Sequence, residues 1–413
     1  MFGINLLNYL DRYVAASVAP MVQKELHLTD SEIGLFGTAF LLVYAVAALP
    51  FGYWADRGVR KHVIGIGVAI WSVATLLTGF ARTYLQLFIS RAAVGIGEAS
   101  YYPAGTSLMS DYFPKEVRSR VMSIWGAGST VGIALGFAGG GYLADLYGWR
   151  TAFFICGGPG LVFAILAFTM REPLRGAVEK GPSLRKTADA GIRQFFDLLK
   201  IPTLRATIIA QTLLFFVLAS NAFWLPTVLQ RRFDLTSTSA GVLAGGVIVI
   251  GGLVGTLAGG WLADKRATST PTAHLEVGIA GFVAGAVLVT AAILSPTMTV
   301  FVPLFLLAVV ALYLYSGPFT ALSQNVVSPG LRASAVTALL FIAHVFGDSH
   351  SPFDIGLLSD WLGGNLQLAL LITSPTLLLA AAAVAAMGLR TVKRDTERME
   401  QEWAARGADA TAS

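Results

Sequence analysis

Two pairs of charged residues lie inside apolar stretches of the chain and are the first candidates for chemistry. Asp11 and Arg12 fall near the middle of one stretch, and Arg91 and Glu98 fall within another. A charge at the centre of a membrane helix costs at least ~3 kcal/mol on insertion scales, so such groups are usually paired and functional. Carboxylates in this setting can take up and release protons, and arginines can bind an anionic group.

The second pair lies on one helical face. About seven residues make two turns of a helix, so Arg91, Gly95, Glu98 and Tyr102 project from the same side. We expect this face to line a cavity. The alternative is a static ion-pair network that only holds neighbouring helices together, although small residues would pack helices at lower cost.

The first pair points in two directions. Asn5, Asn8 and Arg12 share a helical face, whereas Asp11 points about 100° away. We expect Arg12 to face the cavity and to pair with Glu98 in one state of the protein. Asp11 would then be a carboxylate whose proton occupancy depends on its burial and on nearby arginines.

The composition of the chain explains why these charges are exceptional. Of 413 residues, 55% are hydrophobic and 13% are charged, and the mean hydropathy is +0.67. A soluble domain has about a quarter charged residues. The chain is therefore expected to be an integral membrane protein, and not a soluble enzyme, a disordered chain or a nucleic-acid-binding protein. The single cysteine, Cys156, excludes a disulfide scaffold and a cysteine-cluster metal site.

Apolar segments of about 20 residues, the length of a membrane helix, occur twelve times in the sequence. They cover residues 3–22, 33–55, 62–81, 84–109, 120–144, 150–170, 204–228, 239–262, 273–295, 299–327, 333–357 and 365–389.

Lys and Arg are concentrated in the loops on the side of the N-terminus. The opposite loops hold only Lys24, Arg82, Arg150, Arg231 and Arg232. This bias predicts that both termini are cytoplasmic. We expect a multi-pass protein of a plasma membrane, such as the bacterial inner membrane.

The sequence repeats across a polar stretch at its midpoint. Gly52–Asp56 resembles Gly260–Asp264, and Leu143-Ala144-Asp145 resembles Leu358-Ser359-Asp360. The offset is about 208–215 residues each time. We therefore expect an all-α fold of two pseudo-symmetric six-helix bundles, an architecture that suits alternating access to a site at the membrane midplane.

The repeat predicts four parts of the chain. The two bundles are expected at residues 1–170 and 204–389. Between them we expect a cytoplasmic linker at 171–203, whose run Gln194–Lys200 is amphipathic enough to lie on the membrane surface. A charged cytoplasmic tail, 390–413, is expected to be a solvated surface or to touch the membrane edge.

Two stripes of glycines at intervals of four residues occur in the fifth and eighth segments. They are Gly128, Gly132, Gly136 and Gly140, and Gly251, Gly255 and Gly259. Small residues at this spacing allow helices to approach closely. The stripes predict either tight packing within each half or a smooth seam on which the two halves rock.

Motifs for other chemistry are absent from the sequence. It contains no phosphate-binding loop, dinucleotide fingerprint, zinc-protease motif or hydrolase nucleophile elbow, so we expect no enzyme activity and no cofactor. His344, Asp348, His350 and Asp354 splay around a helix, which disfavours a metal site. His344 and Asp348, four residues apart, are expected to line the cavity or its outer mouth, and Pro352 is expected to mark a bend.

Aromatic and polar residues of the seventh and tenth segments are candidates for the walls of the cavity. They are Asn221, Phe223, Trp224, Tyr313, Tyr315 and Ser316. A buried arginine beside aromatic rings suits a ligand with a phosphate or carboxylate head and an apolar tail. The alternative is that these residues belong to the apolar core.

The whole chain resembles the major facilitator superfamily in its two six-helix halves and in its loops GYWADRGVRK (52–61) and GGWLAD (259–264). The resemblance implies a cytoplasmic gate, with Asp56 and Arg57 in the first loop, and we extend it to Arg118 and Asp264. Gly58 comes one place earlier than in the usual form of the loop.

Three segments are similar to the spinster group of lysolipid and sphingolipid transporters: NYLDRY (8–13), GEASYYP (97–103) and HVFGDSHSP (344–352). The resemblance implies that Asp11 and Glu98 are linked to protons. It also implies that Arg12 and Arg91 are their partners and contact an anionic lipid headgroup.

Two other functions remain open at this stage. The first two segments also resemble proton-coupled symporters of small organic anions such as sugar acids. A non-transporting membrane receptor or scaffold is the more remote alternative. In each case we expect a monomer in a lipid bilayer whose partners are a small-molecule or lipid substrate and protons, with no nucleic acid.

Overall fold

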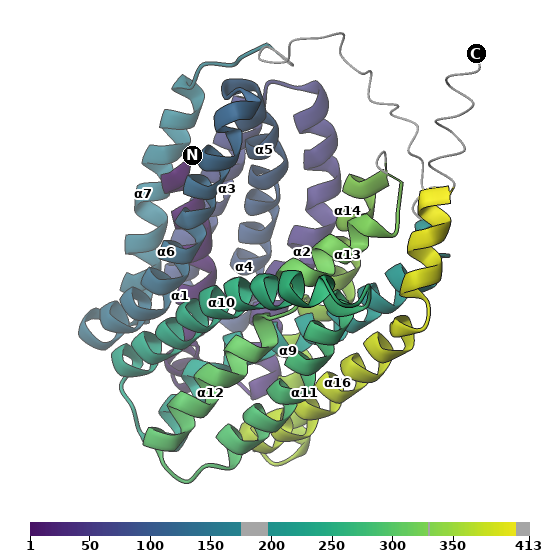
Figure 1. Ribbon diagram of the computed structural model, residues 1–413. Coiled ribbons are helices and arrows are strands. Elements are labelled where there is room, and N and C mark those ends of the chain that lie inside the picture. Colours follow the sequence, from purple (N-terminus) through teal and green to yellow (C-terminus); the bar gives the residue numbers. More distant parts are fainter. Residues whose placement is uncertain (175–196, 329–330, 402–413) are drawn as a thin grey trace. The chain divides into compact units, whose positions relative to one another are not determined.

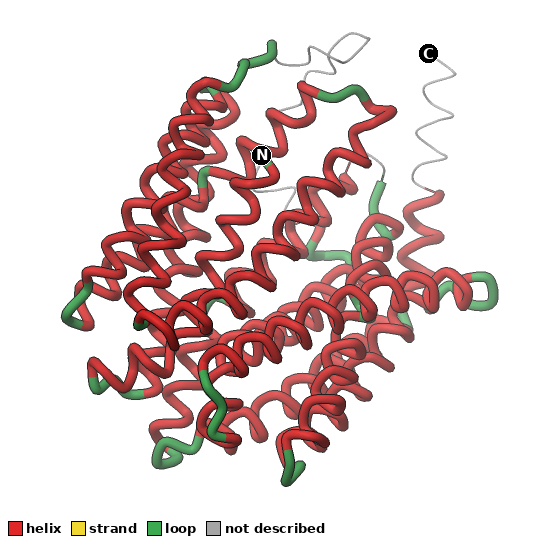
Figure 2. Tube along the Cα trace, turned by 90° about the vertical axis from the view of Figure 1, so that its left-hand side faces the viewer, coloured by secondary structure: helices red, strands yellow, loops and turns green. Residues whose placement is uncertain are grey.

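The computed structural model describes residues 1–174, 197–328 and 331–401, and these residues form helices and no strands. Figures 1 and 2 show that every regular element of the described chain is a helix. Three parts of the chain lie outside the described residues: most of the predicted linker, Pro329 beside the eleventh segment, and the end of the tail.

The first half of the chain contains seven described helices. They are α1 (Phe2–Leu26), α2 (Asp30–Arg57), α3 (Arg60–Phe80), α4 (Tyr84–Ala99), α5 (Tyr101–Tyr112), α6 (Lys115–Tyr147) and α7 (Trp149–Thr169). The fourth predicted segment is thus two helices, α4 and α5, separated at Ser100.

The second half follows the same order. Its helices are α9 (Pro202–Phe233), α10 (Ser237–Ala267), α11 (Ala273–Leu294), α12 (Met298–Tyr313), α13 (Ser316–Asn325), α14 (Arg332–Ala343), the π-helix η2 (His344–Asp348), α15 (Ser351–Trp361) and α16 (Leu366–Leu389). The eleventh predicted segment therefore changes from an α-helix to a π-helix at His344–Asp348. This change lies just before Pro352, where a bend was expected.

Nine helical segments of the described chain are long and apolar enough to cross a membrane. The remaining three predicted segments are also helical, but α1 carries Asp11 and Arg12, and the other two are interrupted as described above. The predicted segments agree with helices to within a few residues at most ends, because a run of about 20 apolar residues can bury its backbone polar groups in lipid only as a helix.

Two compact units divide the chain. The first comprises residues 1–186, 220–249 and 349–369, and the second comprises residues 187–219, 250–348 and 370–413. Segments of the second half, including α15, thus cluster with the first half. The predicted boundaries at 170 and 204 remain a prediction.

The core of the first unit centres on three aromatic residues. The Tyr101 ring lies edge-on to Trp71 and to Trp125, with ring centroids 6.0 and 5.9 Å apart. The Trp125 indole N–H donates to the Tyr101 hydroxyl at 2.5 Å, and that hydroxyl donates to the carbonyl of Met1 at 2.9 Å. These contacts join α3, α5 and α6 to the start of α1.

The glycine stripe of α6 packs against α1 within the first unit. A side chain at Gly132 or Gly136 would collide with the carbonyl oxygens of Leu6 and Leu10. The stripe of α10 packs in the same way within the second unit, where Gly255 faces the carbonyl of Val310 on α12. The stripes therefore serve tight packing inside a unit, and the alternative of a rocking seam along them is wrong.

The segment 390–401 is helical for most of its length, and its charged side chains other than Asp395 are exposed. Val392 is buried, and the carboxylate of Asp395 is only 6% exposed. Asp395 accepts hydrogen bonds at 3.0 and 2.7 Å from the backbone N–H and the hydroxyl of Thr203, in the first turn of α9. The tail thereby caps a helix that begins 192 residues earlier in the chain.

Candidate functional site

Arg12 and Glu98 form an ion pair in the interior of the first unit. Arg12 Nε lies 2.7 Å from Glu98 Oε2, and the Glu98 side chain is fully buried. The guanidinium also lies 5.0–5.1 Å from the ring centroids of Tyr9, Phe40 and Tyr44. The structure thus brings together the two residues whose pairing the helical spacing predicts, and the rings replace part of the water that the charge has lost.

Asp11 points to a different helix from its neighbour Arg12. Its side chain is buried, and Oδ2 accepts a hydrogen bond at 3.0 Å from the hydroxyl of Thr75 on α3. Oδ1 has no hydrogen-bond partner among the described residues. A buried carboxylate with one weak donor and one free oxygen is suited to accept a proton.

Arg91 is the second buried guanidinium of the site. It interacts electrostatically with both Glu98 and Asp11, and its charge lies 5.2 Å from the rings of Phe36 and Phe40. Within the described chain its Nε and one of its terminal nitrogens donate to no acceptor. The ring of Phe40 therefore contacts both arginines, and Arg91 keeps hydrogen-bonding capacity for another group.

Two glycines of α4 allow this helix to pack closely against its neighbours, which positions its charged residues in the interior. A side chain at Gly95 would meet the carbonyl of Phe40 on α2, and one at Gly97 would meet the backbone of Gly67 and Trp71 on α3. The close approach fits α4 between α2 and α3, with Arg91 and Glu98 turned inward. The four charges Asp11, Arg12, Arg91 and Glu98 consequently form one buried cluster, which we call the charge cluster.

The other predicted site residues of the first unit lie in different surroundings. Asn8 is buried on α1, one turn from Arg12. Tyr102 is 57% exposed and stacks on Trp125 at a ring distance of 5.4 Å. Asn221 is buried on α9, and Trp224 is fully buried, with its indole N–H donating to the carbonyl of Pro352. Contact between Trp224 and a substrate would require a movement of α9 or α15.

The predicted cavity residues of the second unit cluster around a change in helix winding. His344 Nδ1 and Asp348 Oδ2 lie 2.6 Å apart across η2, and the His344 ring lies 5.1 Å from that of Phe215. Gly347 approaches the backbone of Thr212, which brings η2 against α9. Tyr313, whose ring lies against Gly252 of α10, and Ser316 are half-buried at the junction of α12 and α13.

The predicted gate residues are mostly exposed. Asp56 and Asp264 are exposed at the ends of α2 and α10, and Arg57 stacks over the ring of Tyr53 at 3.8 Å. Arg118 binds the last turn of α5, donating to the carbonyls of Ser110 and Phe113.

Sequence reasoning missed Arg60, which is the buried charge of this loop. Arg60 is fully buried at the start of α3 and pairs with Asp111 and, at 2.8 Å, with Glu172. Burial opposes ionisation of Glu172, but hydrogen bonds from Arg60 and from the N–H of Lys61 hold the pKa of its carboxyl below the usual value. A signal for these ion pairs was available in the sequence. Two segments that end on the same side as Arg60 carry acidic residues at those ends.

Sequence reasoning also missed a second group, at the opposite end of the first unit, where α1 stops and α2 starts. We call this the α1–α2 end. Asp360 of α15 accepts hydrogen bonds from the N–H groups of Asp30 and Ser31 at 3.0 and 2.9 Å. The Asp30 carboxylate is buried and binds both terminal nitrogens of Arg231, one of them at 3.0 Å, and the hydroxyl of Ser359 at 2.6 Å.

An equivalent contact involves the other member of the sequence repeat. Asp145 of α6 accepts from the N–H groups of Ser237 and Thr238 at 3.2 and 2.7 Å, at the start of α10. It also accepts from the Thr238 hydroxyl at 2.6 Å. Asp145 and Asp360, which match in the repeat, therefore cap α10 and α2, which also match.

Comparisons with known proteins indicate the family of the chain. The family model described as Major Facilitator Superfamily matches residues 1–348. Protein spinster homolog 1 of Xenopus tropicalis is 31% identical over 385 residues, which cover 87% of this chain and 72% of the relative.

Two solved structures are similar along nearly the whole chain. Both are crystal structures of a bacterial homolog to the human lysosomal transporter spinster in inward-facing conformations, and both are 25% identical to this chain. The unoccupied structure covers 96% of each chain with a TM-score of 0.82, and the occupied one covers 95% of each with a TM-score of 0.77.

Proposed function

The chain belongs to the major facilitator superfamily and, within it, to the spinster family, and from this premise we propose that it is a proton-linked transporter of an amphipathic anionic lipid. It is an integral multi-pass membrane transporter, and not an enzyme. The substrate, the proton and the working cycle are the parts that we propose. The observation that carries the proposal is the charge cluster.

The distribution of basic residues supports an orientation with both termini in the cytoplasm. Buried Arg60 and the loops on its side would be cytoplasmic, and the α1–α2 end would face outward. In this orientation the contacts of Asp145 and Asp360 close the outer end of the first unit. The likeness to two inward-facing structures also supports closure at the outer end.

The charge cluster supports coupling to protons. Glu98 is paired with Arg12 at 2.7 Å, whereas the Asp11 carboxylate has a single described donor, Thr75. Protonation of Asp11 removes a negative charge that Arg91 otherwise shares between Asp11 and Glu98. Arg91 then becomes available to an anionic group, which links proton uptake to substrate binding.

The rings around the arginines support an amphipathic substrate. Phe36, Phe40, Tyr9 and Tyr44 lie within about 5 Å of the two guanidinium groups and can contact apolar parts of a ligand. A phosphate or carboxylate headgroup can bind Arg91 through two parallel hydrogen bonds. The resemblance of three sequence segments to the spinster transporters favours a lysophospholipid or sphingolipid over a small sugar acid.

The energy of one proton suffices for accumulation. A proton that moves down a membrane potential of about 100 mV supplies about 2.3 kcal/mol, and one pH unit adds about 1.4 kcal/mol. Together they support a substrate gradient of several hundred-fold, at about 1.4 kcal/mol for each factor of ten.

The proposal is tested by measuring proton binding or release when lysophospholipid is added to the purified protein. The wild type is compared with D11N and with the control D234N, which makes the same chemical change at an exposed turn. Asp234 has a φ of 52°, a conformation that Asn tolerates. We expect a substrate-linked proton signal in the wild type and in D234N, and its loss in D11N.

Other outcomes would overturn parts of the proposal. A signal with sugar acids but not with lysophospholipid would identify a symporter of small organic anions. Measurable lipid binding without a proton signal in the wild type would identify a facilitator without proton coupling. Transport that persists in D11N and E98Q would remove the charge cluster from the mechanism.

A further inference from the structure

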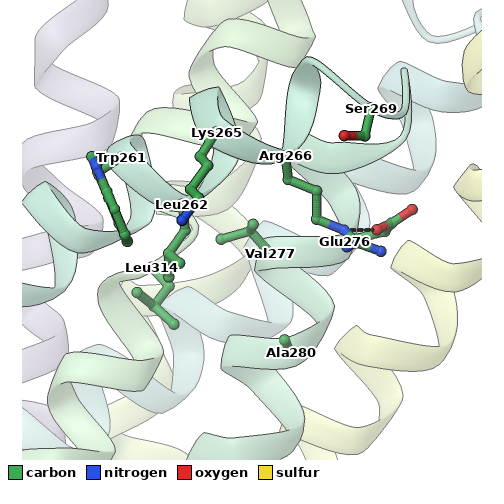
Figure 3. A pocket seen from close by; sticks show the side chains of 9 residues that line it. All are labelled: Trp261, Leu262, Lys265, Arg266, Ser269, Glu276, Val277, Ala280 and Leu314. Carbon is green, nitrogen blue, oxygen red and sulfur yellow. Dashed lines mark hydrogen bonds and ion pairs between the residues drawn. The ribbon is translucent and has the colours of Figure 1, made fainter.

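A pocket of about 590 Å³ lies in the second unit, well apart in sequence from the charge cluster of the first unit. It opens between α10, α11 and the residue Leu314, which joins α12 to α13 (Figure 3). Its apolar lining, which we call the floor, is formed by Leu262, Val277, Ala280 and Leu314, and the basic residues Lys265 and Arg266 come from the last turn of α10.

One positive charge in this pocket is already neutralised. Arg266 forms an ion pair with Glu276 of α11, drawn as a dashed line in Figure 3. The second oxygen of Glu276 accepts a hydrogen bond at 2.5 Å from the hydroxyl of Thr272. Both carboxylate oxygens of Glu276 therefore already accept a hydrogen bond, and its negative charge offsets that of Arg266.

The other positive charge remains available. Lys265 extends into the pocket from α10, above Leu262 and Leu314 (Figure 3). Its Nζ lies 5.1 Å from the ring centroid of Trp261, and in the described chain it forms no ion pair with a carboxylate. An ammonium group with an aromatic ring on one side and an apolar floor below attracts an anion that carries apolar substituents.

The position of the pocket in the membrane specifies the ligand further. Trp261 is 62% exposed, and tryptophan concentrates at the boundary between headgroups and hydrocarbon. In the orientation proposed above, the last turn of α10 lies at the cytoplasmic boundary, where basic pockets between helices bind anionic headgroups. A free phosphate would gain nothing from the apolar floor, whereas a lipid can lay an acyl chain along it.

We propose that this pocket binds an anionic phospholipid of the cytoplasmic leaflet, with its phosphate at Lys265 and Trp261 and an acyl chain along the floor. The lipid would be a resident of the bilayer and not the transported substrate, because the exposed indole of Trp261 marks a pocket at the boundary between headgroups and hydrocarbon. The proposal rests on the membrane orientation proposed above, but not on the identity of the substrate or on proton coupling.

The test measures quenching of Trp261 fluorescence by brominated lipids in nanodiscs. Brominated phosphatidylglycerol is compared with brominated phosphatidylcholine, and the contribution of Trp261 is the part of the quenching that W261F lacks. We expect phosphatidylglycerol to bind about fivefold more tightly than phosphatidylcholine, the effect of one lysine at a membrane surface, and K265M to abolish this preference.

The control is K393M, which removes an exposed lysine of the tail whose nearest carboxylate, that of Glu397, lies 3.8 Å away. The preference should persist in K393M. Equal quenching by the two lipids, or an unchanged preference in K265M, would overturn the proposal. Displacement of the lipid by inorganic phosphate would indicate a general anion site and would also overturn it. Transport is not measured, so failure here is distinct from failure of the proposed function.

Discussion

Asp360 and Asp145 cap two helices that are equivalent in the sequence repeat, but they do so in different electrostatic surroundings. Each helix start also has a local cap of its own: Thr29 accepts from the N–H of Glu32, and Thr236 accepts from the N–H of Ser239, both at 3.2 Å. The other charged and polar groups around Asp360 and Asp145 differ between the two contacts.

The contact at α2 contains fixed charge, and the contact at α10 is built mainly on neutral donors. Asp360 lies beside a second carboxylate, Asp30, which Arg231 neutralises. Asp145 meets two backbone N–H groups and the hydroxyl of Thr238. The same backbone architecture thus carries one contact that depends on a partly buried ion pair and one that depends on hydrogen bonds. We expect the first to be stronger and more sensitive to single substitutions.

The largest effect is expected from R231M. The substitution leaves the buried carboxylate of Asp30 beside Asp360 without a cation, and breaking a buried pair costs 3–5 kcal/mol, which the partial exposure of Arg231 reduces to about 2 kcal/mol. The midpoint of thermal unfolding in detergent should fall. The matched control is R232M, which removes a neighbouring guanidinium that lies 5.0 Å from the Phe233 ring. Equal losses in both variants would contradict the assignment.

A smaller effect is expected from D360A, which removes the carboxylate from the start of α2. Loss of such a cap costs about 1–2 kcal/mol, which increases the population of molecules open at this end by about tenfold. The readout is the labelling rate of a cysteine at Thr38, a buried residue that accepts a hydrogen bond from the N–H of Phe353. The labelled protein carries C156A, since Cys156 is the natural thiol.

The control for D360A is D354A, on the same helix. Asp354 bonds His350 of its own segment at 2.5 Å. D354A should leave the labelling rate of the cysteine at position 38 unchanged. An increase equal to that of D360A would mean that α15 responds to any loss of negative charge.

A still smaller effect is expected from D145A at the start of α10. The local cap at Thr236 remains, no buried charge is left unpaired, and the expected cost is about 1 kcal/mol. A cysteine at Ser17, whose hydroxyl donates to the carbonyl of Phe137 in the interior, reports opening beside α10. If D145A increases the labelling rate at position 17 more than D360A increases the labelling rate at position 38, the proposed ranking of the two contacts is wrong.

The smallest effect is expected from salt. Ionic screening weakens the partly exposed pair of Asp30 and Arg231 but acts little on the hydrogen bonds of Asp145. The difference between R231M and the wild type in unfolding free energy should shrink by about 0.5 kcal/mol at high salt. The effect of D145A should stay constant over the same range, and a change of equal size would contradict the distinction.

Local periodicity made part of the charge cluster predictable. The pairing of Arg12 with Glu98 follows from the faces of two single helices, and the divergence of Asp11 from Arg12 follows from the helical twist. The length and polarity of the apolar runs predicted the helices. Both inferences use information contained within about 25 residues.

Contacts between helix ends were not predictable in this way. Asp30 and Asp360 are 330 residues apart, and Arg60 and Glu172 are 112 residues apart. Nothing in the spacing of either pair specifies which helix ends meet in space. The repeat of Asp145 at Asp360 was visible in the sequence, but it indicated duplication and not the capping of a distant helix. The glycine stripes likewise predicted close packing without identifying the partner helix.

The separation of Asp30 and Asp360 has a consequence for biosynthesis. A ribosome adds about 5–20 residues per second, so the start of α2 waits between about 15 and 65 seconds for the carboxylate that completes its cap. During this time the α1–α2 end of the first unit lacks α15. The cap of α2 is therefore completed only when one of the last helices has been synthesised.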